Sequence, residues 1–244
     1  MVSSILYRLV AFADYSNLNY DSTVLSVLEN LFRDQYSITP SPEPSLTGNP
    51  YIGLNLSSND EDLPIISIGS MRIEIAMPSK KKTGFDEKDL ECAKNKMVSS
   101  LISIYGCFKS RIQDAYRLAW ISNYAYFEIG NKEMSDFRNR YLKPLRYYDD
   151  KSTNEFVAKY AGMDSKTING SEEKLNVLST IYRWFPSQGT GSVTIVDGYG
   201  LELDINTVSE NKKNRFSSHS FGEFVSFADA IKNEIVGEVF NGCF

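Results

Sequence analysis

Six segments of the chain have the composition of β-strands, and several of them alternate apolar and polar residues with a period of two. They lie at residues 4–13, 51–56, 65–77, 116–129, 192–197 and 200–207. The alternation is clear in the last segment, where Glu202 and Asp204 stand between leucine and isoleucine residues. This segment is therefore expected to have one apolar and one acidic face. The acidic link at 59–62 predicts a hairpin turn between the second and third segments.

Two other segments repeat apolar residues every three or four positions, which is the period of an amphipathic helix. The longer one begins with a cap at Asp86 and extends to Ile112. Its apolar positions are Leu90, Ala93, Met97, Leu101, Ile104, Phe108 and Ile112. The other begins after Asp21 or Ser22, both of which are good helix caps.

The second half of the chain has weaker helical patterns. Helices are expected at 133–142, 153–161 and 171–185, with Pro144 ending the first and Gly162 the second. A final helix is expected to start at Ser220 and Glu223, which together form a capping box.

The order of these elements predicts an α+β fold, in which antiparallel sheets carry helices packed on one face. The first part runs strand, helix, strand, strand, helix, strand, which is compatible with a ferredoxin-like half. We therefore expect two α+β halves, 1–130 and 131–244, that are related to each other. One continuous sheet and a single domain shared by both halves is the alternative.

Charge and composition limit the classes of partner and the cellular compartment that are expected for the protein. The 244 residues carry a net charge of −5, and the pI is about 5.1. This acidity argues against a general nucleic-acid binder, whose affinity comes mainly from neutralising phosphates. The N-terminal segment does not resemble a signal peptide, and no apolar stretch is long enough to span a membrane. Three scattered cysteines suit a reducing compartment, so a cytoplasmic protein is expected.

His219 is the only histidine, and this limits the chemistry of the chain. Ser-His-Asp or Cys-His catalysis would have to use this one residue. A zinc site of several histidines and cysteines has too few ligands at workable spacing, and no cofactor motif is present. We therefore expect no cofactor and no metal, and favour a protein that is not an enzyme.

A nuclease is the enzymatic alternative. His219 could act as a general base beside the glycine-rich stretch 189–200, as in the RNA-processing endonucleases of CRISPR systems. The strand carboxylates Glu74, Glu128, Glu202 and Asp204 could instead converge on Mg²⁺. The simpler interpretation is that the glycines form turns and that the carboxylates pair with arginines across strands.

One segment near the middle of the chain combines basic and aromatic residues, the types that dominate interface hot spots. Its candidate binding residues are Arg138, Arg140, Tyr141, Lys143, Arg146 and Tyr147. Such a surface favours a protein partner, and single-stranded nucleic acid is the alternative. The loop 209–219 is polar and basic, and it is expected to be solvated.

Three passages resemble a sporadically distributed family of uncharacterised bacterial proteins of similar length. They are IISIGSMRIEIAMP, RLAWISNYAYFEI, and GLELDINTV followed by the helix FADAIKNEIVGEVF. Where the family has a second acidic position in its Leu-Asp-Ile-Asp strand, this chain has Asn206. The resemblance supports the order of the elements and supplies no catalytic residues. It implies a setting among mobile and defence-type genes.

Taken together, these observations predict a non-enzymatic protein-interaction or regulatory subunit, of a bacterial defence or toxin-control system. A nuclease is the first alternative. The second is a module that binds a small ligand or nucleic acid.

Overall fold

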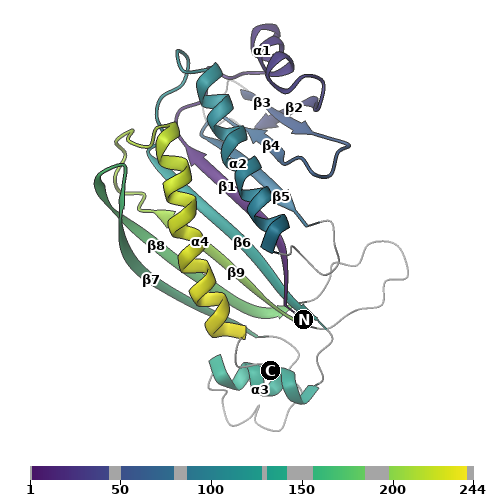
Figure 1. Cartoon of the computed structure of the whole chain (residues 1–244), viewed down its shortest axis with the longest axis vertical. Helices are drawn as coiled ribbons and strands as arrows, with labels where there is room; N and C mark the ends of the chain where they lie inside the picture. Colours follow the sequence, from purple (N-terminus) through teal and green to yellow (C-terminus); the bar gives the residue numbers. More distant parts are fainter. Residues whose placement is uncertain are drawn as a thin grey trace.

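A single antiparallel sheet forms the centre of the protein (Figure 1). The computed structural model describes residues 2–43, 51–79, 87–127, 131–141, 156–184 and 198–240. In these residues, nine strands pair in the order β2-β3-β4-β5-β1-β6-β9-β8-β7. They are β1 (Val2–Phe12), β2 (Ser37–Glu43), β3 (Tyr51–Ser57), β4 (Ile65–Ile68), β5 (Arg72–Pro78), β6 (Arg117–Phe127), β7 (Val157–Ile168), β8 (Ser171–Trp184) and β9 (Gly198–Thr207).

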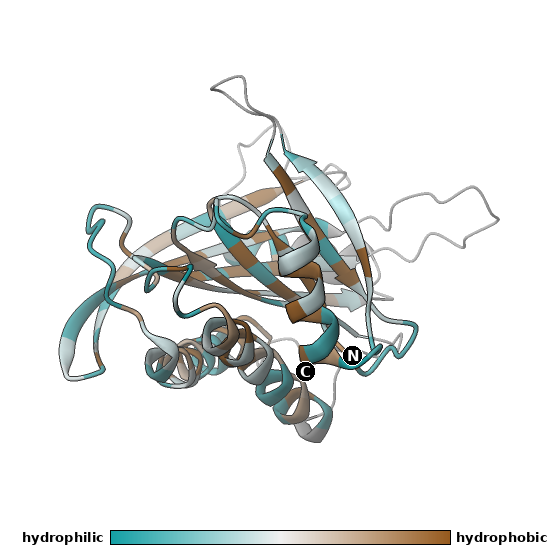
Figure 2. Cartoon of the chain, turned by 90° about the horizontal axis from the view of Figure 1, so that it is seen from above, coloured by the Kyte–Doolittle hydropathy of each residue, from teal (hydrophilic) through white to brown (hydrophobic). Residues whose placement is uncertain are grey.

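The helices lie on one side of this sheet, as Figure 2 shows. They are α1 (Ser22–Phe32), α2 (Glu87–Cys107), α3 (Asn131–Tyr141) and α4 (Ser218–Phe240). The long helices α2 and α4 contact each other, α2 covers β5, and α4 covers β6 and β7. The predicted α+β class, with antiparallel strands and helices packed on one face, is thus confirmed. No helix in the described part of the chain is long and apolar enough to cross a membrane.

Strand alternation decides which side chains face the helices. The central strands turn every second residue toward α2 and α4, and most of these residues are apolar. The central set is Tyr7, Leu9 and Ala11 of β1, Ile73, Ile75 and Met77 of β5, Leu118 and Trp120 of β6, and Leu201, Leu203 and Ile205 of β9. Burying each large side chain of this kind contributes about 1.5–3 kcal/mol, so this layer drives the fold.

Several elements form where the sequence pattern predicts them. Strands β1, β3, β6 and β9 match expected segments, and β3 pairs with β4 across the predicted hairpin. The carboxylate of Asp21 caps α1 by accepting hydrogen bonds of 2.9 Å from the backbone N–H groups of Thr23 and Val24. The apolar stripe of α2 is buried from Ala93 to Ile104.

The expected strand at 65–77 is two strands, so this prediction was wrong. The chain turns back between β4 and β5, where the Gly69 N–H donates to the Arg72 carbonyl at 2.8 Å. Met71, within the expected strand, is exposed in the turn. The alternating pattern runs on either side of the turn, and it therefore conceals the break.

The expected helices at 153–161 and 171–185 are also wrong, because β7 and β8 form a long hairpin. Its two-residue turn is Asn169-Gly170, with φ of 50° and 77°. An Asn-Gly pair is the strongest short-range signal for such a turn, since both positions need positive φ. The apolar spacing of 171–185 also fits a strand, in which Leu175 and Ile181 face the helices.

Helix α4 begins at Ser218, so the predicted capping box at Ser220 and Glu223 does not form. Ser220 is buried inside the first turn. The Glu223 carboxylate instead accepts a hydrogen bond of 2.6 Å from the backbone N–H of Asn169. This contact ties the tip of the β7–β8 hairpin to α4.

A buried cluster of charges joins α2 to α4. The carboxylate of Asp229 lies 2.5 Å from the ammonium of Lys232 and 2.9 Å from that of Lys94. Only 3% of the Lys232 side chain is exposed, and burial lowers its pKa. Burial acts to raise the pKa of Asp229, but hydrogen bonds from Lys232 and Lys94 outweigh it and hold that pKa below its usual value. Asp229 therefore neutralises two lysines that water reaches poorly.

Replacing Asp229 by Asn is expected to lower the free energy of unfolding by about 3 kcal/mol at pH 7, because it leaves the buried Lys232 without a counter-charge and Lys94 with the exposed Glu91 alone. The pKa of Asp229 is lower in the folded state, so its contribution is present above the unfolded pKa and is lost as the pH falls through the folded value. The difference between wild type and variant should therefore shrink below about pH 4. Urea unfolding at several pH values measures it.

Glu91→Gln is the matched control. Glu91 also contacts Lys94, at 2.6 Å, but its side chain is 63% exposed. An exposed pair contributes about 0–1 kcal/mol. Equal losses in the two variants would contradict the assigned role of the buried cluster.

Candidate functional site on the open face of the sheet

The sheet face opposite α2 and α4, here called the open face, has a different composition. On β9 and β8 the residues that point to it include amides, carboxylates and hydroxyls, and β6 adds Asn123 between apolar neighbours. We use the name polar platform for five of them: Asn123, Tyr182, Glu202, Asp204 and Asn206. Register places Asn123 opposite Glu202, while Asp204 lies opposite Leu178 and Asn206 opposite Asn176.

Hydrogen bonds fix the orientation of the amides in the polar platform. Asn123 Nδ2 donates to Glu202 Oε2 at 3.3 Å, and Asn206 Nδ2 donates to Asp204 Oδ1 at 2.9 Å. Asn176 Nδ2 lies 3.4 Å from Asn206 Oδ1. Each carboxylate is thus held by a neutral amide. Neither forms a salt bridge with any other described residue.

Tyr182 lies flat across the open face. A Cβ atom placed on Gly200 would be 2.7 Å from Cζ of the Tyr182 ring and 2.9 Å from its hydroxyl oxygen, so the ring rests directly on the glycine. The ring starts on β8 and crosses β9, and its hydroxyl interacts with the side chain of Asn123 on β6. Burial, with a smaller effect from the charge of Glu202, raises the pKa of Tyr182. The hydroxyl therefore stays protonated at neutral pH.

The open face also contains an orphaned acceptor. Asn123 Oδ1 is buried and has no hydrogen-bond partner. Its Nδ2 atom is committed to the Glu202 carboxylate, so exchanging the two amide atoms would place oxygen against oxygen. The polar platform thus offers three acceptor groups, which are the two carboxylates and this carbonyl.

Arg8 and Glu74 form a separate pair on the same face. Their charged atoms are 3.9 Å apart, and Glu74 is also 4.0 Å from Arg72. By register, Arg8 lies opposite Ile121, and Ile121 lies opposite Asp204. Two strand spacings, about 10 Å, therefore separate Arg8 from the polar platform.

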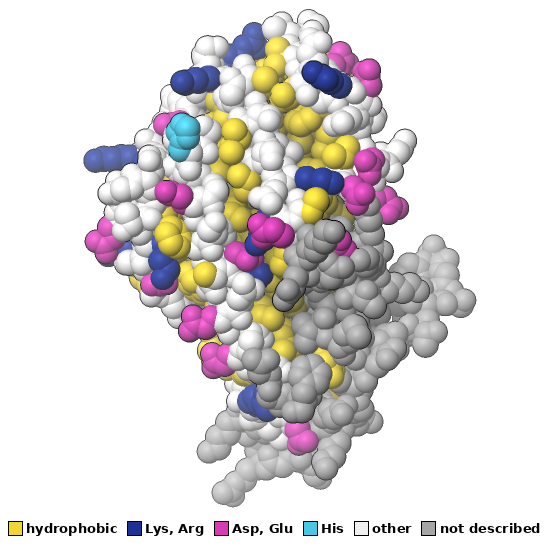
Figure 3. Space-filling view, in the orientation of Figure 1, with side chains coloured by type: hydrophobic (Ala, Val, Ile, Leu, Met, Phe, Trp, Pro, Cys, Tyr) yellow, Lys and Arg dark blue, Asp and Glu magenta, His cyan; other side chains and the backbone are white. Residues whose placement is uncertain are grey.

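The structure does not bring the proposed nuclease residues together. Glu202 and Asp204 are on the open face, whereas His219 is exposed in the first turn of α4, on the opposite side of the sheet. Figure 3 shows the helix-covered face, with the chain's one histidine at its surface. Among the residues that the structure describes, no group of three or more His, Cys, Asp or Glu is placed to hold a metal ion. Glu128 and most of the glycine-rich stretch lie outside those residues.

The candidate surface on and after α3 is described only in part. Arg138 is buried, and its guanidinium donates from Nε and Nη2 to Asn139 Oδ1. Arg140 is exposed, and the Tyr141 hydroxyl donates to the Val239 carbonyl at 3.0 Å. Tyr141 thus attaches α3 to the end of α4. Lys143, Arg146 and Tyr147 lie outside the described residues.

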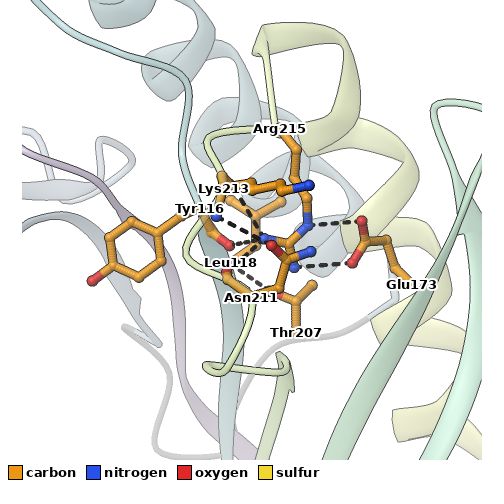
Figure 4. Close-up of polar contacts among 7 residues, drawn as sticks. All are labelled: Tyr116, Leu118, Glu173, Thr207, Asn211, Lys213 and Arg215. Atoms are coloured by element: carbon orange, nitrogen blue, oxygen red, sulfur yellow. Dashed lines mark hydrogen bonds and ion pairs between the residues drawn. The ribbon is translucent and has the colours of Figure 1, made fainter.

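Arg215 was expected in a solvated loop, and this expectation was wrong (Figure 4). Its guanidinium binds the buried Glu173 carboxylate through two hydrogen bonds of 2.7 and 2.9 Å. It also donates to the backbone carbonyls of Tyr116, Asn211 and Lys213. Because these donors are satisfied, Arg215 fastens the loop before α4 to β8 and to the start of β6. Its role is structural.

Sequence reasoning identified Glu202 and Asp204 but missed Asn123, Tyr182 and Gly200. Tyr182 falls in the segment 171–185, which was expected to be a helix and is strand β8. The Asn169-Gly170 pair would have indicated the hairpin, and with it a strand period for 171–184. No local signal shows that Tyr182 crosses two strands to reach Asn123.

Replacing Gly200 by Ala is expected to push the Tyr182 ring off the open face and to lower the free energy of unfolding by about 1–3 kcal/mol, through overpacking. The ring's aromatic proton shifts and urea unfolding measure the two effects. Gly162→Ala on β7 is the matched control, because its added Cβ would meet no atom within 4 Å. An unmoved ring in the Gly200 variant would refute the assigned packing.

Comparisons with known proteins add no relative of this chain. No protein-family model matches it. No curated protein and no solved structure matches it either. Its function is therefore inferred from its own side chains.

Proposed function

We propose that the protein is a non-enzymatic interaction or regulatory subunit that binds a protein partner at the β7 edge of its sheet. The observation that carries this proposal is the edge itself. β7 is 12 residues long, and it pairs with β8 on one side and with no described strand on the other. Unpaired strand edges of this length are templates for a further strand.

The hairpin register shows which backbone groups are free on this edge. Ile168 and Ser171 close a two-residue turn, so they form a hydrogen-bonded pair. Hydrogen-bonded pairs then recur at every second residue. The N–H and C=O groups of Ala161 and Met163 consequently point away from β8, toward the unpaired side. The Ser165 N–H points the same way, but it already donates to Asp164 Oδ1 at 2.7 Å.

Apolar side chains surround the same edge on the open face. Val157, Met163 and Leu178 are 48%, 64% and 39% exposed. Leu178 lies opposite Ala161, so Met163 is its diagonal neighbour. Exposed apolar groups next to a free edge are typical of a protein-interaction site.

The other edge of the sheet is protected. β2 contains Pro40 and Pro42, which have no N–H to offer to an added strand. β7 contains no proline, and Lys166 is paired with Asp164 at 2.9 Å. The contrast supports β7 as the edge that accepts a partner. The resemblance to a bacterial family with defence-type genes further supports a subunit of a defence or toxin-control system.

The double variant Ala161→Pro, Met163→Pro removes two outward N–H groups and leaves the β8 ladder intact. A tagged wild-type protein purified from its host should retain a stoichiometric partner. The variant should retain at least about tenfold less of this partner, equivalent to a loss of about 1.4 kcal/mol of binding free energy. Mass spectrometry and gel densitometry measure the retained fraction.

Ala161→Ser, Met163→Leu is the matched control, because it changes the same side chains and keeps both N–H groups. Circular dichroism verifies that each variant is folded. A partner retained equally by the proline variant would show that the β7 edge is not the binding site.

A further inference from the structure

Helix α1 lies beside the outer strand β2 (Figure 1), and a cavity of about 150 Å³ lies between them. We call it the aromatic cavity. Six of the side chains that line it are aromatic or aliphatic: Tyr20, Leu25, Leu28, Phe32, Tyr36 and Ile38. An apolar cavity of this volume is large enough for a group about the size of benzene.

A second cavity, of about 440 Å³, adjoins the first, because Asp34 and Tyr36 line both. We call it the polar cavity. Its other walls include the hydroxyls of Ser37 and Ser57 and the carboxylate of Asp60. Apolar walls beside a few convergent polar groups are typical of small-molecule binding sites.

We infer that the two cavities form a binding site for an organic cation with a methylated ammonium group. The aromatic cavity takes the ammonium group, and the polar cavity takes the polar remainder of the ligand. The inference is independent of the proposed function, because β2 and β7 are opposite edges of the sheet.

The charged groups of the two cavities select a cation. Glu29 and Asp34 line the aromatic cavity, and Asp60 joins Asp34 in the polar cavity. None of these three carboxylates forms an ion pair with another described residue. Arg33, next to Asp34 in the chain, and Lys96, whose ammonium donates to the Asp62 carbonyl at 2.8 Å, line neither cavity. The site therefore attracts a positive group and repels a phosphate.

The walls of the aromatic cavity distinguish a methylated ammonium from a primary one. A primary ammonium is strongly hydrated and has three N–H donors that need acceptors. Leu25, Leu28 and Phe32 offer none, so burying it there is unfavourable. A fully methylated ammonium has no N–H group, and its methyl groups are apolar. Aromatic rings attract such a cation through the negative charge of their faces.

The backbone brings Asp34 and Tyr36 to the cavities through an unusual turn after α1. Arg33 and Asp34 have φ of 46° and 63°, a conformation that residues other than glycine rarely adopt. Two such residues in a row are typical of functional sites, where the surrounding structure maintains the strain. Burial, with a smaller effect from the charge of Asp60, raises the pKa of Tyr36 to about 12. Its hydroxyl is therefore a donor at neutral pH.

The full-length protein can be titrated with choline, with the aromatic NMR shifts of Tyr20, Phe32 and Tyr36 as the readout. Saturable shifts are expected, with a dissociation constant in the millimolar range. Dimethylbutanol, the uncharged analogue with carbon in place of nitrogen, should bind at least about tenfold more weakly. Phosphocholine should also bind more weakly, because its phosphate meets Asp34 and Asp60.

A methylated ammonium can come from a small molecule or from a modified protein. Titration with N-acetyl-trimethyllysine methylamide distinguishes these sources. Saturable binding of either probe at the three rings supports the inference, and the tighter of the two identifies the source.

Two site variants and one control complete the test. Glu29→Gln with Asp34→Asn, and separately Tyr36→Leu, should each reduce choline binding by at least about tenfold. Asparagine tolerates the left-handed conformation at position 34, so the turn is kept. Glu61→Gln removes an exposed carboxylate that lines neither cavity, and it should leave binding unchanged.

Three results would overturn the inference. They are the absence of saturable binding to wild type, equal binding of choline and dimethylbutanol, and choline binding that the site variants do not change. The first two need no variant, so they hold even if a substitution disturbs folding. Circular dichroism verifies that each variant is folded.

Discussion

The pairing of β6 with β9 is the contact on which the rest of the structure depends. It runs over nine residue pairs, from Ala119 opposite Asn206 to Phe127 opposite Gly198, and it joins the first six strands of the sheet to the last three. Trp120 lies opposite Ile205 in this pairing, and both are fully buried beneath the helices. Without it, β7 and β8 would have no sheet to extend. The polar platform would not exist either, because its residues come from β6, β9 and β8.

The sheet separates two environments that need opposite chemistry. On the helix-covered face, buried aromatic and aliphatic side chains pack beneath α2 and α4, and the Asp229 carboxylate is paired with the ammonium groups of both Lys94 and Lys232. On the open face, Glu202 and Asp204 remain without cationic partners among the described residues. A carboxylate left uncompensated in the first environment would cost several kcal/mol, whereas in the second it remains available to a ligand. The two-residue strand period lets one strand, β9, serve both.

The two edges of the sheet show the same division between stability and binding. Prolines close β2, and a long strand without proline leaves β7 open. The hairpin is held in place by contacts that leave the outer side of β7 unpaired among the described strands. Glu223 holds its tip, and Arg215 with Glu173 holds β8 beside the loop that leads into α4. The free side of β7 and the open face beside it are then presented on a fixed support.

The sequence by itself determined the strongly periodic elements: β1, α1, α2, β6, β9, and the α+β class with helices on one face. The apolar residues of each of these segments can all be buried in only one kind of element, either helix or strand. The local pattern and the tertiary structure therefore agree. It also placed Glu202 and Asp204 together on the polar face of a strand. It failed at 153–185, where the apolar spacing fits both helix and strand and the Asn169-Gly170 turn had to decide. Only the tertiary structure brought Tyr182 across Gly200 to Asn123, and only it left β7 at an edge, because both facts depend on the order of strands. That order is set by contacts between residues far apart in the chain, which a local pattern does not record.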